Sequence, residues 1–203
     1  MKEPMLYRVI RRPLGAIFKA IYKPVIVGKR FIPESGRIIL AGNHTNYFDC
    51  ILVGCATKRC VHFLAKDELM KGPLKFIFKG MGIIPVNRRT KDKAALESAI
   101  ATLNDEKLIG IFPEGTRSKD YKPARAKSGV AMIANKAKAP VLPVSIYNCD
   151  EMKKKSKITV RFGELIPYEN LGMSEEATRE ETKACAKMIM SEIVKLWEMG
   201  HCE

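Results

Sequence analysis

Apolar positions along this chain follow two alternating patterns, which predict different kinds of secondary structure. Short β-branched runs bounded by polar or glycine-containing turns are typical of buried strands, and stretches of helical periodicity separate them. We expect strands at 25–31, 37–41, 61–65, 108–111, 139–146 and 158–162, and helices at 48–57, 69–81, 92–104, 129–137 and 173–199. This alternation predicts an α/β fold, with a single domain and a mixed, mostly parallel sheet flanked by helices. Pro140 and Pro143 remove backbone donors from 139–146, so we expect that strand at an edge or in an irregular wall.

The first 24 residues have a different pattern, in which apolar pairs recur about every four residues with lysines and arginines between them. This pattern is typical of a basic amphipathic helix, either continuous or restarted at Pro13. We interpret residues 1–24 as a membrane-surface segment and residues 25–203 as the main domain. The alternative is a helix that packs only against its own domain.

Charge supports a partner of opposite sign. The chain has 36 Lys and Arg against 22 Asp and Glu, a formal net charge of +14. Eight basic residues and one acidic residue lie in the first thirty positions. An anionic bilayer surface suits this segment, because each basic residue near the headgroups contributes about 1 kcal/mol. No recognised nucleic-acid-binding motif contains these residues, so we predict no nucleic-acid partner.

The remaining composition predicts a cytoplasmic protein that lies peripherally on the inner face of the cell membrane. No run approaches the roughly 18 to 20 apolar residues of a spanning helix, and the N-terminus lacks the pattern of a cleaved signal peptide. The six cysteines contain no Cys-x2-Cys pair, and there are only three histidines. We therefore predict reduced cysteines and no metal.

Candidate chemistry lies in two polar stretches, 43–49 and 112–118, each of which follows an expected buried strand. The carboxyl ends of strands are where α/β sheets place their sites. Residues five apart lie roughly 140° apart around a helix, so a loop is the better setting for His44 and Asp49. In a loop the carboxylate can fix the imidazole tautomer while the other ring nitrogen takes a proton. The alternative is a loop histidine beside an aspartate that caps a helix.

The second stretch contains groups that suit a phosphate-bearing polyol. It offers a carboxylate, a glycine that admits close backbone approach, a hydroxyl and a guanidinium, from Glu114, Gly115, Thr116 and Arg117. An apolar run at 82–86 leads to Arg88, and Lys66 ends another expected strand. We expect these strand ends to present a base and cationic sites together.

Taken in order, these motifs resemble those of the glycerolipid acyltransferases, and above all the bacterial 1-acylglycerol-3-phosphate (lysophosphatidic acid) acyltransferases. The motifs are Asn43-His44-x4-Asp49, Gly82 to Arg88, Phe112 to Ser118 and Val141 to Val144, and the similarity runs from about Val27 to Pro167. The resemblance implies transfer of an acyl group from acyl-CoA or acyl carrier protein to the free hydroxyl of the lysophospholipid, giving phosphatidic acid, with no cofactor besides this co-substrate.

The resemblance also implies roles for individual residues. His44 would be the base and Asp49 its partner. The substrates would be held by Arg88, Glu114, Gly115, Thr116 and Arg117, with Asn43 and Lys66 as further contacts.

Several alternatives stay open at this point. The acceptor could be another lysophospholipid or glycerol-3-phosphate, and Cys50 or Ser118 could be acylated first in a covalent route. The chain could instead be a non-catalytic binder of anionic lipids. Direct transfer needs chiefly a base and oxyanion donors, because a thioester is already activated.

Overall fold

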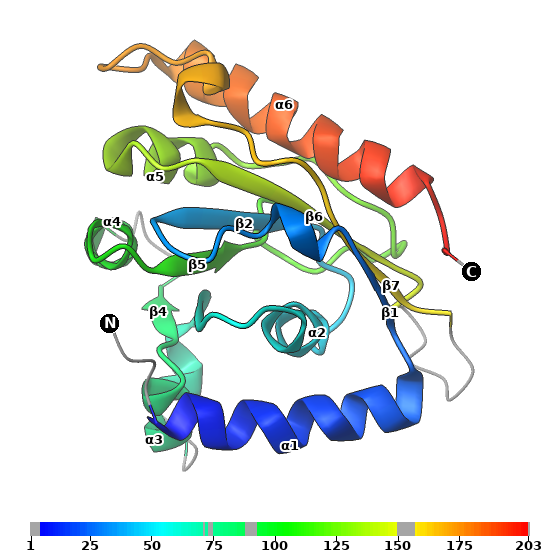
Figure 1. Ribbon diagram of the computed structural model, residues 1–203. Coiled ribbons are helices and arrows are strands. Elements are labelled where there is room, and N and C mark those ends of the chain that lie inside the picture. Colours follow the sequence, from blue (N-terminus) through cyan, green and yellow to red (C-terminus); the bar gives the residue numbers. More distant parts are fainter. Residues whose placement is uncertain (1–4, 71, 73–74, 88–92, 150–156, 203) are drawn as a thin grey trace.

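The computed structural model describes residues 5–70, 72, 75–87, 93–149 and 157–202, and its centre is one seven-stranded sheet (Figure 1). The strand order is β1-β7-β6-β2-β5-β3-β4. The strands are β1 (Val25–Val27), β2 (Ile38–Gly42), β3 (Val61–Lys66), β4 (Ile84–Val86), β5 (Leu108–Ile111), β6 (Val141–Tyr147) and β7 (Thr159–Phe162). Every neighbouring pair is parallel except β6 with β7. The predicted single domain with a mixed, mostly parallel sheet is confirmed.

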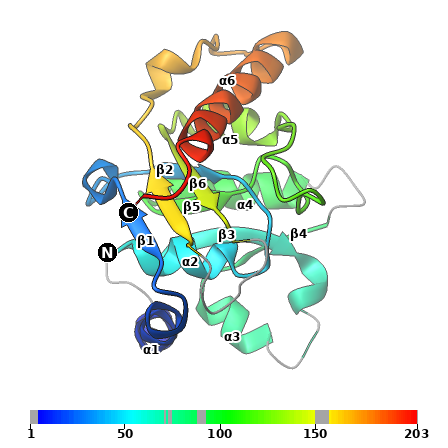
Figure 2. The same cartoon turned by 90° about the vertical axis from the view of Figure 1, so that its right-hand side faces the viewer.

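Helices cover both faces of this sheet. They are α1 (Met5–Tyr22), α2 (Asp49–Ala56), α3 (Lys75–Gly80), α4 (Lys93–Asn104), α5 (Gly129–Ala137) and α6 (Arg179–Glu198), with 3-10 turns η1 (Lys29–Phe31), η2 (Asp67–Met70) and η3 (Tyr168–Leu171). Helices α5 and α6 lie on one face, while α2 lies on the other with α1 as an outer layer beyond it (Figures 1 and 2). Within the described residues, no helix is both long and apolar enough to cross a bilayer.

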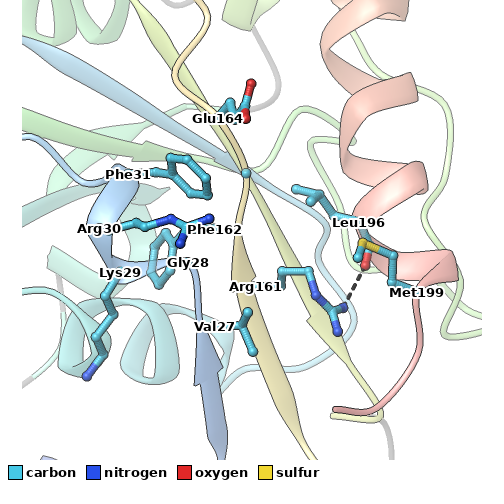
Figure 3. A pocket seen from close by; sticks show the side chains of 11 residues that line it. Val27, Gly28, Lys29, Arg30, Phe31, Arg161, Phe162, Glu164, Leu196 and Met199 are labelled. Atoms are coloured by element: carbon cyan, nitrogen blue, oxygen red, sulfur yellow. Dashed lines mark hydrogen bonds between the residues drawn. The ribbon is translucent and has the colours of Figure 1, made fainter.

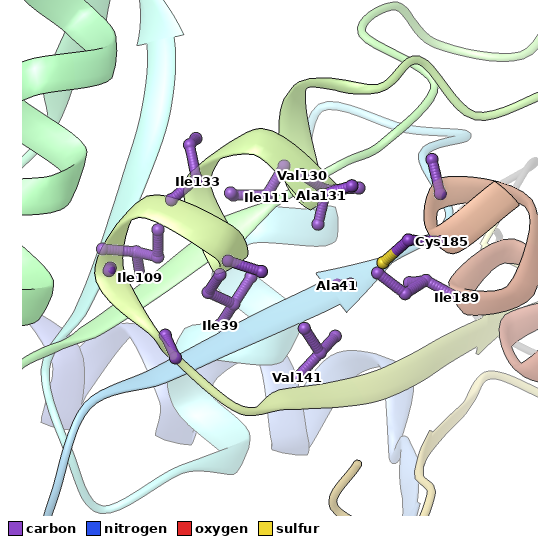
Figure 4. Close-up of a cluster of buried hydrophobic side chains, with 14 of the residues drawn as sticks. Ile39, Ala41, Ile109, Ile111, Val130, Ala131, Ile133, Val141, Cys185 and Ile189 are labelled. Atoms are coloured by element: carbon purple, nitrogen blue, oxygen red, sulfur yellow. The ribbon is translucent and has the colours of Figure 1, made fainter. Parts of the chain in front are cut away.

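A large apolar cluster fills the space between the sheet and helices α4, α5 and α6 (Figure 4). Ile39, Ile109 and Val141 contribute to it from three adjacent strands and are fully buried. Strands β2 and β5 are buried at every position, as expected for parallel strands whose two faces are both covered. Each fully buried aliphatic side chain contributes roughly 1.5–3 kcal/mol, so these strands form a rigid base for the loops at their carboxyl ends.

Helix α1 packs on α2 through one face of its own. Tyr7 and Phe18 are buried there. The Tyr7 hydroxyl donates to the Gly54 carbonyl at 3.4 Å and accepts the Val61 amide at 3.3 Å. The helix is continuous through Pro13, so of the two predicted forms the structure contains the single one.

Strand β6 was expected at an edge or in an irregular wall, and the first of these two positions is wrong. It lies between β2 and β7. The carbonyl of Pro143 accepts the Gly163 amide at 2.9 Å, so its ring nitrogen faces the same way, toward Gly163. Because Gly163 lies just beyond the end of β7, the missing donor leaves the β6–β7 ladder complete.

Three other predicted elements differ at their ends, each for a local reason. The strand expected at 25–31 stops at Val27, because Gly28 adopts a positive φ of 77° and starts a 3-10 turn. The helix expected at 69–81 divides into η2 and α3. The last helix begins only at Arg179, where Thr178 and Glu181 form a reciprocal capping box.

Candidate active site

The loop between β2 and α2 holds His44 and Asp49 against each other. His44 Nδ1 lies 2.8 Å from Asp49 Oδ2, and the same oxygen accepts the backbone amides of Thr45 at 2.7 Å and Asn46 at 2.8 Å. The Asp49 side chain is completely buried, whereas 13% of the His44 side chain is exposed. An ionised carboxylate only accepts, so the Nδ1 proton faces Asp49 and Nε2 remains available as a base.

Glu114 connects this loop to the one that follows β5. Its Oε2 accepts the backbone amide of His44 at 3.2 Å, and its Oε1 accepts that of Ala124 at 3.1 Å. Burial raises the pKa of this carboxyl to about 7, opposed by these two amides and assisted by the nearby charge of Asp49. In return, the carbonyl of His44 accepts the Ser118 amide at 2.8 Å. The two predicted stretches are therefore in direct contact.

Aromatic rings set the plane of the imidazole. The ring of His44 stacks on Phe112 with a centroid separation of 4.2 Å and an angle of 14°. Phe112 in turn lies parallel to Phe63 of β3, at 5.9 Å and 8°. A Cβ on Gly110 of β5 would lie 2.3 Å from the Phe63 ring, so only glycine leaves room for this stack.

The loop after β5 also presents a cation at the surface. The Arg117 guanidinium lies over the Tyr47 ring, 3.6 Å from its centroid. Both residues are exposed, and Tyr47 belongs to the same loop as His44. Gly115 turns the chain with a φ of 73°, and a Cβ there would lie 3.0 Å from Lys127 Nζ. Thr116, between Gly115 and Arg117, is exposed. Sequence reasoning overlooked Tyr47, although an aromatic side chain in a polar loop was a usable signal.

Three other predicted site residues are Asn43, Lys66 and Arg88. The amide side chain of Asn43 is fully buried and bonds in both directions with the backbone of Ile146, at 2.9 and 2.7 Å. Lys66 is exposed at the end of β3, with its Nζ 3.8 Å from Glu68 Oε2. Arg88 lies outside the described residues. Among the residues that are described, no group of three or more His, Cys, Asp or Glu side chains is placed to hold a metal ion.

Comparison with known proteins gives the family of this chain. The model of the Acyltransferase family matches residues 23–147, more than half of the chain. The chain belongs to this acyltransferase family. The chain is also similar to a Borreliella burgdorferi protein named 1-acyl-sn-glycerol-3-phosphate acyltransferase, with 34% identity over 147 residues, which are 70% of this chain and 58% of that relative.

Two further relatives match almost the whole acyltransferase chain. A Bacillus subtilis protein with the same name is 26% identical over 196 residues, which are 94% of this chain and 96% of the relative. The crystal structure of the 1-acyl-sn-glycerophosphate (LPA) acyltransferase PlsC from Thermotoga maritima is 26% identical, with a TM-score of 0.68 over 94% of this chain and 80% of that one. This chain therefore spans nearly all of the Bacillus relative but under two thirds of the Borreliella one.

A separate cavity of about 440 Å³ lies away from this site, at the edge of the sheet formed by β1 and β7 (Figure 3). Its walls include Phe31, Leu196 and Met199. The guanidinium of Arg161 beside it donates to the carbonyls of Leu196 at 2.8 Å and Gly200 at 3.1 Å. Arg161 thus satisfies the carboxyl end of α6, which is a structural role.

Proposed function

We propose that this acyltransferase moves a fatty acyl group from an acyl thioester to the free hydroxyl of 1-acylglycerol-3-phosphate, giving phosphatidic acid. The observation that carries the proposal is the His44–Asp49 pair, which leaves the second ring nitrogen of His44 available as a base. The names of the Borreliella, Bacillus and Thermotoga relatives support the choice of acceptor.

In the proposed reaction, Nε2 of His44 takes the proton of the acceptor hydroxyl as its oxygen attacks the thioester carbonyl. The tetrahedral oxyanion then collapses, the bond from carbon to sulfur breaks, and the imidazolium returns the proton to the leaving thiolate. The buried Asp49 carboxylate stabilises the imidazolium throughout, because it lies 2.8 Å from Nδ1. No nucleophilic side chain is required.

A covalent alternative would begin at Cys50 or Ser118. The Ser118 hydroxyl donates to Asp120 at 2.5 Å, which directs it toward a carboxylate instead of the imidazole. Cys50 is half-buried in the first turn of α2. Mass spectrometry of the enzyme incubated with acyl donor alone should show no adduct under direct transfer, whereas a stoichiometric acyl adduct would establish the covalent route.

Recognition of the phosphate is assigned to Arg117, with Arg88, Lys66 and Thr116 as further contacts. The guanidinium suits phosphate because it can donate two parallel hydrogen bonds. The Arg117 guanidinium lies over the ring of Tyr47, which belongs to the same loop as His44. We assign acyl-CoA or acyl carrier protein as the donor, and no other cofactor.

We further propose that α1 holds the enzyme on the inner, cytoplasmic face of the cell membrane. One side of α1 packs on α2, but Leu6, Val9, Ile17 and Ile21 are between 39% and 57% exposed. On a helix these four positions lie on one side. Arg12 and Lys19 flank them, which suits a helix lying in the headgroup region of anionic lipids. Residues 1–24 would then be the membrane-surface segment and 25–203 the acyltransferase domain.

The proposed function is tested with purified enzyme, lysophosphatidic acid and acyl donors of varied chain length, with product measured by mass spectrometry. Formation of phosphatidic acid in the wild type, and its loss in His44→Ala, are the expected results. A variant at His62, which lies on β3 with Nδ1 2.9 Å from the Gly82 carbonyl, is the matched control. Binding to anionic vesicles without any acyl transfer would instead support a non-catalytic lipid-binding protein.

A further inference from the structure

The carboxylate of Glu114 is turned inward, although it belongs to the loop that presents Arg117 to solvent. The residue is only 5% exposed. Each of its oxygens accepts one main-chain amide, from His44 at 3.2 Å and from Ala124 at 3.1 Å. Both oxygens of Glu114 are therefore engaged by the protein itself.

The main chain of His44 is held on both sides by this one loop. Its amide donates to Glu114, and its carbonyl accepts the amide of Ser118 at 2.8 Å. Asp49 holds the imidazole and the next two backbone amides. The backbone and the ring of the base are thus fixed by two different carboxylates.

Burial argues against a direct contact between Glu114 and a phosphorylated acceptor. The residue is only 5% exposed, and both of its carboxyl oxygens already accept main-chain amides. Gly115 separates the inward Glu114 from the outward Thr116 and Arg117 through its φ of 73°. The sharp turn lets consecutive residues of one loop face opposite directions.

We propose that Glu114 is a positioning residue, which fixes the main chain of His44 and leaves recognition of the phosphate to the outward-facing residues of its loop. This proposal rests on the proposed function, because it assigns a role within the same site. It replaces the contact with the acceptor that family resemblance implied for Glu114. A base displaced by about 1 Å can lose a factor of about 100 in rate, so the role has a large kinetic signature.

The test compares Glu114→Gln and Glu114→Ala with the wild type in kcat and in KM for lysophosphatidic acid, per mole of folded enzyme. We expect kcat to fall about tenfold in the glutamine variant, which keeps one carbonyl acceptor, and about 100-fold in the alanine variant. KM for the acceptor should stay within about twofold. A raised KM with kcat unchanged would mean a contact with the phosphate and would overturn the proposal.

A second readout separates positioning from stability alone. The chain has only three histidines, at 44, 62 and 201, so their imidazole NMR signals can be followed individually. In Glu114→Gln the His44 signals should move while those of His62 and His201 stay in place. Unchanged His44 signals and unchanged kcat, in a variant that merely melts at a lower temperature, would reduce Glu114 to a structural role.

Controls make the result interpretable in either direction. Glu34→Gln changes an exposed glutamate before β2 and should leave kcat, KM and the histidine signals unaltered. If the alanine variant does not fold, the near-isosteric glutamine variant carries the test by itself. If the wild type proves to lack acyltransferase activity, the proposed function fails, yet the NMR comparison still decides whether Glu114 positions His44.

Discussion

Replacing Asp49 by asparagine should separate the chemical role of this carboxylate from its structural one. Oδ2 of Asp49 accepts three hydrogen bonds, from the His44 ring and from the amides of Thr45 and Asn46. The carbonyl oxygen of asparagine can accept all three in the same place. The amide nitrogen then replaces Oδ1, which is buried and makes no hydrogen bond within the described residues.

The magnitudes follow from these contacts. Asp49→Asn buries one amide group without a partner, which costs about 1–3 kcal/mol. For a chain of this length, 1 kcal/mol lowers Tm by about 2–4 °C. The rate should fall much further, by about 10³–10⁴, since a neutral amide does not stabilise the imidazolium. Asp49→Ala removes the acceptor of three donors, one buried and two partly buried, at up to about 1–3 kcal/mol each, a large share of the roughly 5–15 kcal/mol that holds a domain folded.

The assay measures kcat for phosphatidic acid formation at a temperature well below both melting transitions, alongside Tm by circular dichroism. Asp105→Asn is the matched control, because that carboxylate is exposed and pairs with Lys107 at the surface. The reasoning is refuted if Asp49→Asn retains more than about a tenth of the wild-type kcat, since the ion pair would then contribute little to the transition state.

Three other predictions concern separate parts of the structure. Arg117→Lys keeps the charge but loses the planar donor pair, so KM for lysophosphatidic acid should rise about tenfold or more with kcat little changed; an unaltered KM would contradict its phosphate role. Gly110→Ala would place a Cβ 2.3 Å from the Phe63 ring and should destabilise the protein by about 1–3 kcal/mol, seen as a lower Tm. Gly129→Ala is the control, because no heavy atom lies within 4 Å of its added methyl group and the Tm should not fall. The pKa of Glu114 is about 7 in the folded protein against an ordinary 4.5, so the folded state binds the extra proton between these pH values. The stability that this proton contributes is therefore complete below about pH 4.5 and is lost, by a few kcal/mol, as pH rises through about 7. Denaturant titrations should show that the free energy of unfolding falls less between these pH values in Glu114→Gln than in the wild type.

The central strands could be predicted because their residues are apolar on both faces, and the helices because apolar residues recur along one face. The runs before His44 and Phe112 became β2 and β5, and the helix at 129–137 was predicted at both ends. The position of β6 could not be read from its prolines, because the ring of Pro143 faces a residue just beyond β7. That arrangement depends on where another strand ends, which local sequence does not contain.

The candidate site shows the same division. The sequence predicted that His44 and Asp49 would meet, because a loop lets an imidazole and a carboxylate five residues apart face each other, and the structure contains this contact. It did not predict that Glu114 and Asn43 bond to main-chain groups, because the partners, His44, Ala124 and Ile146, are distant in sequence. Nor did it predict that Arg117 would lie over the Tyr47 ring or that His44 would stack on Phe112. Such contacts between the two loops form only once β2 and β5 are paired.

The contact between α1 and α2 has a practical consequence for anyone who shortens this protein. Phe18 lies 5.3 Å, between ring centroids, from Phe48, the residue just before Asp49. Removing α1 would uncover Phe48 and the apolar side of α2 while also deleting the Tyr7 bonds to Gly54 and Val61. An inactive truncated chain would therefore say nothing about the proposed bilayer attachment. Substitutions such as Val9→Glu or Ile17→Glu on the outward side are the cleaner test, because they leave the contact between α1 and α2 in place.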